Sequence, residues 1–513
     1  MIFIMSSAYC SADFELEFGK IPPSFLPLGN KRLYEYQVRL FQKLNETIIL
    51  TLPQSFQISR YDFLKLKSLN VRILYIPDNL RLAEALIYAI NMNSPINESV
   101  YILHGDTYFS TIQYLKNHLV VSKVKENYKW AYLLDRQVLN YNIEEKDIED
   151  CELVLSGFFN IEYPYFLIKC ILDNNYSFID GLKQYSKTYA FRIIQNDSWL
   201  DFGLITNYFH SRKSVSTQRV FNCLIVDRNF ITKSSSWNNK IKAEINWFRN
   251  FPQEYSIYLP RFYYGNAKSY QLEYLYLNTL LDLFVFGKLP HYIWRSIFNS
   301  IKIFLETIHK IKSNNEEIVF NYKTKTLKRL KQLDSIDISF SKKYSFNSSE
   351  SISISEILTS LDINISKKQD IALIHGDFCF SNIMYDFRSK NIKTFDPRGM
   401  DFDDNITVYG DVCYDYAKLV HSVLGLYDFI ISGFARCTIQ EDKIFFAIDI
   451  SDEIVKIQEE FLAIFKIDKQ ICSITIHLFA SMLPLHADDE NRQKALFANI
   501  FRLYFYFKNR GLL

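Results

Sequence analysis

The stretch LIHGDFCFSNIMYD (373–386), followed by FDPRG (395–399), is the feature that most restricts the fold of this 513-residue chain. It places Asp377 in a His-Gly-Asp turn, Asn382 five residues later and Asp396 fourteen residues after that. A turn directly after the apolar run IALI points the Asp377 carboxylate out of a predicted strand. A second predicted strand, NIKTF, delivers Asp396 beside it. The spacing therefore predicts a local arrangement that brings three polar side chains together.

These three side chains suit phosphoryl transfer. That reaction needs a carboxylate that orients the acceptor, and oxygen ligands that hold Mg²⁺ against the phosphates. Asp377 supplies the carboxylate. The amide oxygen of Asn382 and the carboxylate of Asp396 are the hard ligands that Mg²⁺ prefers. The simpler alternative is a tight turn whose carboxylates are only solvated.

The same residues resemble a known family. HGDFCFSNIMYD and TFDPRG are similar to the catalytic and metal-binding loops of the aminoglycoside phosphotransferase and choline kinase superfamily, whose fold is protein-kinase-like. The resemblance implies that Asp377 is the catalytic Asp, that Asn382 and Asp396 are Mg²⁺ ligands, and that ATP is the phosphoryl donor. His375 matches the residue that opens the loop. The later segment GDVCYDYAKL resembles the one that follows in these kinases, with Asp415 in a structural role.

The upstream half of such a kinase is partly present. FITKSS places Lys233 at the end of a predicted strand, and Glu244 lies in the helix predicted over residues 240–251. The pair resembles the kinase Lys and Glu that tether the α- and β-phosphates. QLEYLYLNTL (271–280), which includes Glu273, resembles the hinge that meets the adenine ring, whereas STQRVFNCLIVD lacks a Gly-rich phosphate loop. The alternative for Lys233 and Glu244 is an ordinary exposed pair.

Length and texture predict two domains, because 513 residues exceed what a single core usually supports. In residues 1–212 short apolar runs alternate with helix-like segments, which favours βαβ units and a mostly parallel sheet. From residue 213 we expect a strand-rich small lobe (213–285) and then a helical lobe (286–513). A Ser-rich stretch, about 335–355, is expected to be a surface excursion.

The first half carries a second resemblance. PPSFLPLGNKRLYEYQ (22–37) and YILHGDTYF (101–109) are similar to the opening segment and the metal-binding strand of sugar-phosphate nucleotidyltransferases. Two later segments, LVLSGFFNIE with Gly157 and WLDFGLITNYFHSR (199–212) with Asp201, also resemble segments of that family. The resemblance makes Asp106 and Asp201 metal-binding carboxylates that share a Mg²⁺ on an NTP, and Gly157 a sugar-contacting glycine. It implies a fold class of α/β, with a Rossmann-like (GT-A-like) nucleotidyltransferase domain followed by the protein-kinase-like, two-lobed α+β domain.

The first half also departs from that family. The family begins with a glycine-rich segment whose backbone amides approach the triphosphate, whereas this chain has SSAYCSAD (6–13). The motif's Lys aligns with Pro23. Lys20, Lys31 and Arg32 are the candidates to replace it, and Lys31 is our predicted nucleotide-binding residue. A degenerate domain kept for packing or substrate recruitment is the alternative.

Composition excludes several classes of function. Lys plus Arg (59) nearly balances Asp plus Glu (57) without a long basic run, so nucleic acid is not an expected partner. The eight Cys include no C-x-x-C pair, which argues against structural zinc. MIFIM is too short for a signal-peptide core, and no uncharged apolar run reaches the roughly 18 residues of a membrane span. We expect a cytoplasmic protein.

The two resemblances together predict a bifunctional enzyme. With Mg²⁺ and ATP it would phosphorylate a hydroxyl of a sugar, a choline-like compound or another small alcohol. A second NTP (CTP, UTP or GTP) would then activate that phosphate, as in bacterial capsule or lipopolysaccharide biosynthesis. The alternatives are an active kinase with a non-catalytic first domain, and a nucleotide-binding scaffold or sensor. The acidic stretch DFDD (401–404) has two open interpretations, attraction of a cation such as choline and a solvated turn.

Overall fold

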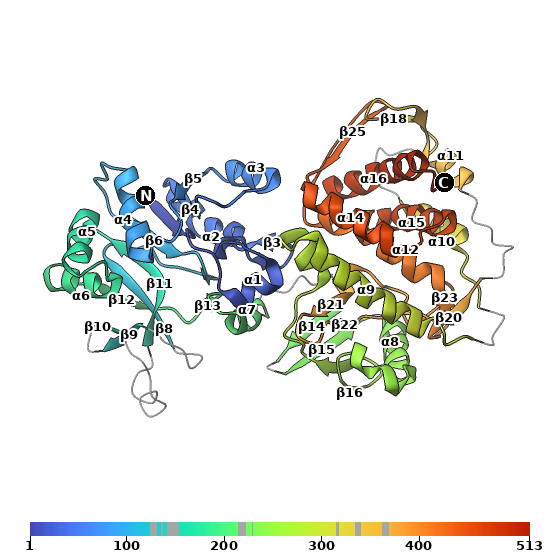
Figure 1. Cartoon of the computed structure of the whole chain (residues 1–513), viewed down its shortest axis with the longest axis horizontal. Coiled ribbons are helices and arrows are strands. Elements are labelled where there is room, and N and C mark those ends of the chain that lie inside the picture. Colours follow the sequence, from blue (N-terminus) through green and yellow to red (C-terminus); the bar gives the residue numbers. More distant parts are fainter. Residues whose placement is uncertain are drawn as a thin grey trace. The chain divides into compact units, whose positions relative to one another are not determined.

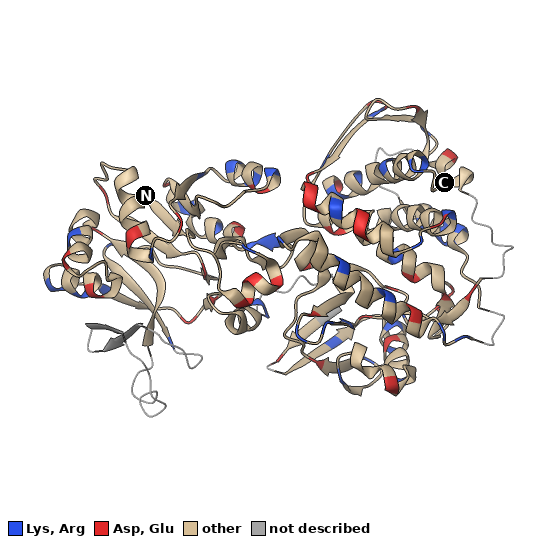
Figure 2. Cartoon of the chain, viewed as in Figure 1, with Lys and Arg blue, Asp and Glu red and all other residues tan. Residues whose placement is uncertain are grey.

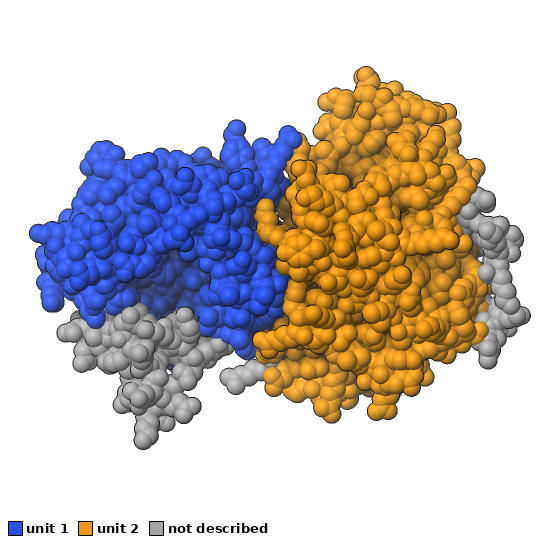
Figure 3. Space-filling view, in the orientation of Figure 1, with its two compact units in different colours: residues 1–215 blue, residues 216–513 orange. Residues whose placement is uncertain are grey.

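The computed structural model describes residues 1–123, 131–134, 137–140, 153–213, 222–227, 229–313, 318–333, 340–361 and 369–513. The chain forms two compact units, Met1–Val215 and Ser216–Leu513 (Figure 1, Figure 3). Charges of both signs are interspersed over the ribbon of each unit (Figure 2). No helix in the described part of the chain has both the length and the apolarity that crossing a membrane requires.

The first unit is built on one large sheet. Its parallel half has the order β5 (Val71–Ile76), β4 (Ile48–Pro53), β1 (Ile2–Met5) and β6 (Val100–His104). β11 (Leu153–Ile161) continues the sheet antiparallel to β6, followed by β8 (His118–Lys123) and β12 (Arg192–Gln195). β9 (Ala131–Leu134) and β10 (Gln137–Asn140) extend from β11. This order, with β1 inside the sheet, is that of a Rossmann-like fold.

Helices cover both faces of this sheet. The helices α4 (Leu82–Met92), α5 (Pro164–Asp173) and α6 (Phe178–Thr188) share one core, and α2 (Leu33–Phe41) and α3 (Arg60–Ser68) share the other. Successive side chains of a strand point to opposite faces, so in β1 Phe3 joins the α4 core and Ile4 the α2 core. The remaining elements are α1 (Ala12–Phe18), α7 (Ile205–Arg212) and the strand pairs β2 (Pro27–Leu28) with β3 (Lys31–Arg32) and β7 (Thr107–Phe109) with β13 (Trp199–Asp201).

The second unit begins with a small lobe. An antiparallel sheet in the order β14 (Asn222–Val226), β15 (Phe230–Ser235), β17 (Ser269–Glu273) and β16 (Phe262–Gly265) is accompanied by helix α8 (Asn238–Asn250). The fully buried Trp247 of α8 donates its indole N–H to the Ile374 carbonyl, 2.7 Å away. This bond ties the small lobe to the strand that precedes the His-Gly-Asp turn.

The rest of the second unit is mainly helical. Its helices are α9 (His291–Ile308), α10 (Tyr322–Leu330), α11 (Ile354–Ser360), α12 (Val412–Val423), α13 (Tyr427–Ile431), α14 (Asp452–Ile464), α15 (Lys469–Met482) and α16 (Glu490–Asn509). Two short antiparallel pairs carry the motif loops: β20 (Ile371–Leu373) with β23 (Tyr409–Asp411), and β21 (Ile383–Asp386) with β22 (Asn391–Thr394). The predicted fold class, a Rossmann-like domain followed by a two-lobed kinase-like domain, is confirmed.

The Ser-rich stretch differs from the expected surface excursion. Residues 334–339 lie outside the described residues, but β18 (Tyr344–Phe346) and β19 (Ser351–Ile352) join a sheet with β25 (Lys443–Ile448) and β24 (Ala435–Gln440). Tyr344 and Phe346 are buried, and both rings contact Phe501 of α16. The two aromatic residues alternate with serine and so share one face, a pattern that the serine-rich composition obscured.

Candidate active sites

The turn from His375 to Asp377 is fixed by its own side chains. Burial lowers the pKa of His375, so its ring is neutral. Its Nε2 lies 3.1 Å from the Phe395 carbonyl, and its Nδ1 accepts the Asp377 N–H at 3.3 Å. Gly376 has a φ of +74°, and a Cβ there would lie 2.7 Å from the Cβ of Arg398. A side chain at this position would strain the turn, which explains the glycine.

Asp415 of α12 stabilises this turn through hydrogen bonds to its backbone. Its Oδ2 accepts the N–H of His375 at 2.9 Å, and its Oδ1 accepts the N–H of Gly376 at 2.7 Å. His309 Nε2 lies 3.2 Å from the same carboxylate, which is fully buried. A buried acid whose oxygens all meet donors fixes backbone geometry rather than reacting.

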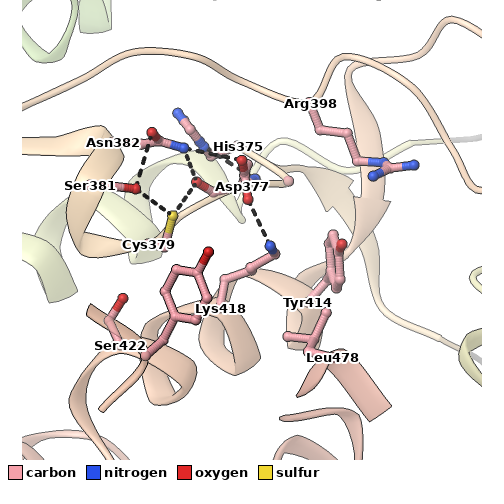
Figure 4. Close-up of polar contacts among 12 residues, drawn as sticks. His375, Asp377, Cys379, Ser381, Asn382, Arg398, Tyr414, Lys418, Ser422 and Leu478 are labelled. Carbon is pink, nitrogen blue, oxygen red and sulfur yellow. Dashed lines mark hydrogen bonds and ion pairs between the residues drawn. The ribbon is translucent and has the colours of Figure 1, made fainter. Parts of the chain in front are cut away.

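Asp377 itself remains accessible between two partners (Figure 4). Its Oδ2 accepts the Asn382 side-chain N–H at 3.2 Å, and its Oδ1 pairs with Lys418 of α12 at 2.8 Å. The Asp377 side chain keeps 38% of its exposure, against 14% for Lys418. Burial alone raises the pKa of Asp377, but Lys418 and its hydrogen bond outweigh this and hold the pKa well below its usual range. The carboxylate is thus ionised and available to a hydroxyl group.

Lys418 was missed by the sequence reasoning. It lies in the segment GDVCYDYAKL, three residues after Asp415, which places both side chains one helical turn apart on the same face of α12. That spacing is the signal that was available. Only the packing of α12 beneath the turn makes Lys418 a partner of Asp377.

Lys233 and Glu244 meet as the kinase resemblance implies. Lys233 of β15 lies 2.9 Å from Glu244 of α8 and also forms an ion pair with Asp396. Lys233 is 6% exposed and Glu244 0%, so the alternative of an exposed surface pair is wrong. Burial and the Asp396 charge raise the pKa of Glu244 to about 7. Burial also opposes ionisation of Asp396, yet Lys233 and Lys240 lower its pKa to about 2.

Asn382 and Asp396 lie at the same end of the β21–β22 hairpin. The strands pair Ile383 with Thr394, and the Phe395 N–H donates to the Asn382 carbonyl at 3.2 Å. Asn382 Nδ2 donates hydrogen bonds to Asp377, so the amide oxygen of Asn382 points away from Asp377. No three His, Cys, Asp or Glu side chains of the described residues form a metal site by themselves. One amide and one carboxylate oxygen fit Mg²⁺, which takes few protein ligands and uses phosphate oxygens as well.

Glu273 ends β17 at the predicted hinge. Its backbone N–H donates to the Arg261 carbonyl at 2.9 Å, and its carboxylate accepts the Arg261 N–H at 3.1 Å. Residues 274–278 then leave the sheet without forming a helix or a strand. A role for Glu273 and this segment in binding adenine stays a prediction.

In the first unit Asp106 and Asp201 come together. β13 pairs with β7 so that Asp201 is opposite Thr107, and the Phe202 N–H donates to the Asp106 carbonyl at 2.8 Å. A Cβ at Gly203 would lie 2.9 Å from Asp106 Oδ2 and 3.3 Å from Asp201 Oδ1, so both carboxylates face the space beside Gly203. Burial raises the pKa of Asp106. Two carboxylates at adjacent strand ends can share one cation.

Gly157 lies against Thr107, the residue that follows Asp106. It has a φ of +80° where β11 is irregular, and a Cβ there would lie 2.8 Å from Thr107 Oγ1 and 3.0 Å from His104 Nδ1. His104 was also missed by the sequence reasoning. Its buried Nε2 has no hydrogen-bond partner among the described residues, and burial lowers its pKa to about 4.

The three candidate cations for the missing motif Lys differ in their surroundings. Arg32 is 3% exposed and is used internally, because it pairs with Asp62 at 3.3 Å. Lys20 lies over the Tyr9 ring, 4.4 Å from its centroid. Lys31 is partly exposed in β3, and burial together with the Arg39 charge lowers its pKa. Lys31 therefore stays the predicted nucleotide-binding residue.

The segment in place of the glycine-rich start lies close to the acidic pair. The Asp106 charge acts on Cys10, where it adds to burial in raising the pKa of the thiol. The Ser6 N–H donates to Thr51 Oγ1 at 2.9 Å, and the Ser6 hydroxyl accepts the Ser24 N–H at 3.0 Å. These bonds hold the start of the segment to the sheet edge, and a thiol neighbours Asp106.

No family model matches the sequence, and no curated protein is similar to it in sequence. Solved structures similar to the chain include the nucleoside-diphosphate-sugar pyrophosphorylase of Vibrio cholerae (11% identity, 41% of this chain, 99% of the other, TM-score 0.35). Another is the CTP:phosphocholine cytidylyltransferase of Streptococcus pneumoniae (13%, 42%, 98%, TM-score 0.34). A choline/ethanolamine kinase family protein of Mesorhizobium loti covers a larger part (7%, 60%, 97%, TM-score 0.35). Similarities at this level do not assign a function.

Proposed function

We propose that the second unit is an ATP-dependent kinase that phosphorylates a hydroxyl of a small molecule. The observation that carries this proposal is the ionised, partly exposed Asp377, held at 2.8 Å by Lys418 and at 3.2 Å by Asn382. Phosphoryl transfer depends mainly on positioning and charge stabilisation, and this arrangement supplies both. The part of the site that would bind ATP is supported by the ion pairs of Lys233 with Glu244 and with Asp396.

Each residue has a defined task in this proposal. Asp377 accepts a hydrogen bond from the acceptor hydroxyl and takes its proton as the new bond to phosphorus forms. Lys233, fixed by Glu244, meets the phosphates of ATP. Mg²⁺ bound by Asn382 and Asp396 would neutralise the phosphate charge. Asp415 keeps the turn in place so that Asp377 does not move away from the hydroxyl.

We further propose that the first unit transfers a nucleotidyl group to the phosphate that the second unit makes. Asp106 and Asp201 face one point beside Gly203, where a Mg²⁺ on CTP, UTP or GTP would be held. The acceptor phosphate would lie near Gly157, and the products would be an NDP-linked compound and pyrophosphate. Such products serve as donors in bacterial capsule or lipopolysaccharide synthesis, and the enzyme would work in the cytoplasm, where nucleotides are abundant.

A non-catalytic first unit is the second candidate. It is favoured by Cys10 beside Asp106, at the place where glycine amides would meet the triphosphate. Calorimetric titration with each Mg-NTP, together with an assay for pyrophosphate release, separates the two. Binding of an NTP without pyrophosphate release in the presence of the phosphorylated acceptor supports the sensor.

The kinase proposal is tested by Mg²⁺-dependent ADP release with purified protein and its Asp377→Asn variant. The acceptors should include sugars, polyols, choline, ethanolamine and hydroxy acids. We expect one class of acceptor to stimulate ADP release in the wild type and not in the variant. Stimulated ADP release that persists at the same rate in the variant would refute the role of Asp377.

A further inference from the structure

Two adjacent aromatic rings, those of Phe402 and Tyr414, are surrounded by cations. Lys325 Nζ of α10 lies 3.6 Å from the centroid of the Phe402 ring, and the Arg398 guanidinium carbon lies 5.2 Å from the same ring. The Tyr414 ring, 5.3 Å from that of Phe402, has Lys325 Nζ at 5.2 Å and Lys418 Nζ at 6.0 Å. The rings therefore join three cations that come from α10, α12 and the loop after β22.

Arg329 adds a fourth positive charge. It follows Lys325 by one turn of α10, and both side chains are partly buried. Burial, followed by the charges of Arg398, Arg329 and Lys418, lowers the pKa of Lys325 well below its usual range. We call Lys325, Arg329, Arg398 and Lys418 the basic cluster.

The basic cluster has more positive than negative charge. Lys418 is paired with Asp377, whose charge also acts on Lys325, and the charge of the exposed Asp404 acts on Arg329. Among the described residues no carboxylate is within ion-pair distance of Lys325, Arg329 or Arg398. Their hydrogen bonds go to neutral oxygens: the Tyr414 hydroxyl (3.2 Å), the Ser481 carbonyl (3.4 Å), and the Met400 and Asp401 carbonyls (2.9 and 3.0 Å).

Partly buried cations without counter-ions are costly, and a bound anion would remove that cost. The acidic stretch 401–404, which the structure describes in full, forms no ion pair with these cations, although the charge of Asp404 acts on Arg329. The Asp401 carboxylate accepts the N–H groups of Asp403 (2.8 Å) and Asn405 (2.9 Å), and Asp403 and Asp404 are exposed. The stretch forms a turn, and its interpretation as a site for a choline-like cation stays a prediction.

The position of the cluster indicates which substrate it meets. The phosphates of ATP belong with Lys233 and Asp396, which form their own ion pair. Lys418 instead contacts the Asp377 carboxylate, where the acceptor hydroxyl must lie (Figure 4). Figure 4 shows Arg398 and Tyr414 on one side of Asp377 and Cys379 on the other. The basic cluster thus lies beside the acceptor end of the reaction.

We propose that the acceptor of the kinase carries an anionic group of its own, a carboxylate or a phosphate, bound by Lys325, Arg329 and Arg398. This inference rests on the proposed kinase function. The acceptor oxygen forms a bond to the γ-phosphorus of ATP, the bond from that phosphorus to the bridging oxygen breaks, and the hydroxyl proton goes to Asp377. The products are ADP and a phosphate ester of an already anionic compound.

The test compares acceptors matched in size. Glycerol, glycerate and glycerol 3-phosphate, and glucose, gluconate and glucose 6-phosphate, are titrated calorimetrically into the full-length wild type in the presence of Mg-ADP, with choline as the cationic member. We expect at least one anion to bind and its neutral counterpart and choline to bind at least about tenfold more weakly, since removing a charge partner costs at least one factor of ten. The carboxylate and phosphate members distinguish the two kinds of anion.

Lys325→Met should weaken binding of that anion at least about tenfold and leave the affinity for Mg-ATP unchanged. Lys328→Met, which removes an exposed lysine of the same helix, should change neither affinity and is the control.

Three outcomes would overturn the proposal. The neutral compounds or choline would bind as tightly as the anions, no anion would bind at all, or Lys325→Met would lose as much affinity for Mg-ATP as for the anion. ADP release that depends on Asp377 but needs only a neutral acceptor would refute the anionic acceptor and keep the kinase. If an anion binds to the basic cluster but no acceptor stimulates ADP release that depends on Asp377, the proposed kinase function is refuted and the anion site stands.

Discussion

The ammonium nitrogen of Lys418 lies 2.8 Å from Asp377 Oδ1, and it lowers the pKa of a carboxylate that burial would otherwise raise. A base with a low pKa stays ionised over the whole physiological range. Lys418 therefore decides how far into acid the proposed kinase keeps its activity.

Replacing Lys418 by Met should move the acid limb of the kcat profile to higher pH. Without the ammonium group the pKa of Asp377 rises, so more of the carboxylate is protonated and inactive at a given acidic pH. We expect a shift of about one pH unit or more, with Lys418→Arg close to the wild type, because an adjacent opposite charge changes a carboxylate pKa by about 1 to 3 units. A rate that falls equally at every pH would show that Lys418 only supports the fold.

Asp415→Ala should destabilise the second unit severely. The change leaves the buried N–H groups of His375 and Gly376 without an acceptor, and we expect a loss of about 3 to 5 kcal/mol in the free energy of unfolding. Asp370→Asn is the matched control, because Asp370 pairs with Lys312 on the surface and should change stability by less than about 1 kcal/mol. Differential scanning calorimetry measures both. Equal melting temperatures for the two variants would contradict the bracing role of Asp415.

Asp377→Asn and Asp106→Asn should each affect one activity. The first should lower the rate of ADP formation by about 10² to 10⁴, because the base is lost, and leave pyrophosphate release from a supplied phosphate intact. Asp106→Asn should lower the rate of pyrophosphate release and leave the rate of ADP formation intact, since Asp106 and Asp201 lie in the other unit. Assays of both products on both folded variants test the prediction. Loss of both activities in either variant would contradict two independent sites.

Asp428 should make the second unit less stable as pH rises. This residue of α13 is fully buried, and burial raises its pKa from about 4 to about 7. Between those values the folded state keeps a proton that the unfolded state has lost, so the free energy of unfolding falls with increasing pH, by about 1.4 kcal/mol per pH unit. Asp428→Asn should remove this dependence, and its stability relative to the wild type should grow between pH 5 and pH 7. A difference that is constant with pH in calorimetry would contradict the shift.

The parts of the site that the sequence predicted are local. Asp377, Asn382 and Asp396 lie within a turn and one hairpin, so their spacing alone brings them together. The strands of the first unit could also be predicted from the sequence, because buried parallel strands are continuous apolar segments. Asp106, in contrast, is a candidate because YILHGDTYF resembles the metal-binding strand of sugar-phosphate nucleotidyltransferases.

The basic cluster could not be predicted in this way. Lys325 precedes Arg398 by 73 residues and Lys418 by 93, and they meet only because α10 and α12 both pack against α15. The sequence of a polar amphipathic helix carries no local signal that separates a solvated lysine from one that packs against Phe402 and Tyr414. Tyr344 and Phe346 illustrate the same limit, since their partner Phe501 lies far along the sequence, in the last helix α16.

Helix α12 contributes two side chains to the His375–Asp377 turn. Asp415 accepts hydrogen bonds from its backbone, and Lys418 forms an ion pair with the Asp377 carboxylate. Lys325 and Arg329, in contrast, come from α10. In the proposed kinase, α12 thus supports the carboxylate that reacts, whereas α10 provides two of the three cations proposed to bind the acceptor. We therefore expect substitutions of Lys325 and Arg329 to change which acceptor the proposed kinase prefers, and substitutions of Asp415 and Lys418 to affect every acceptor alike.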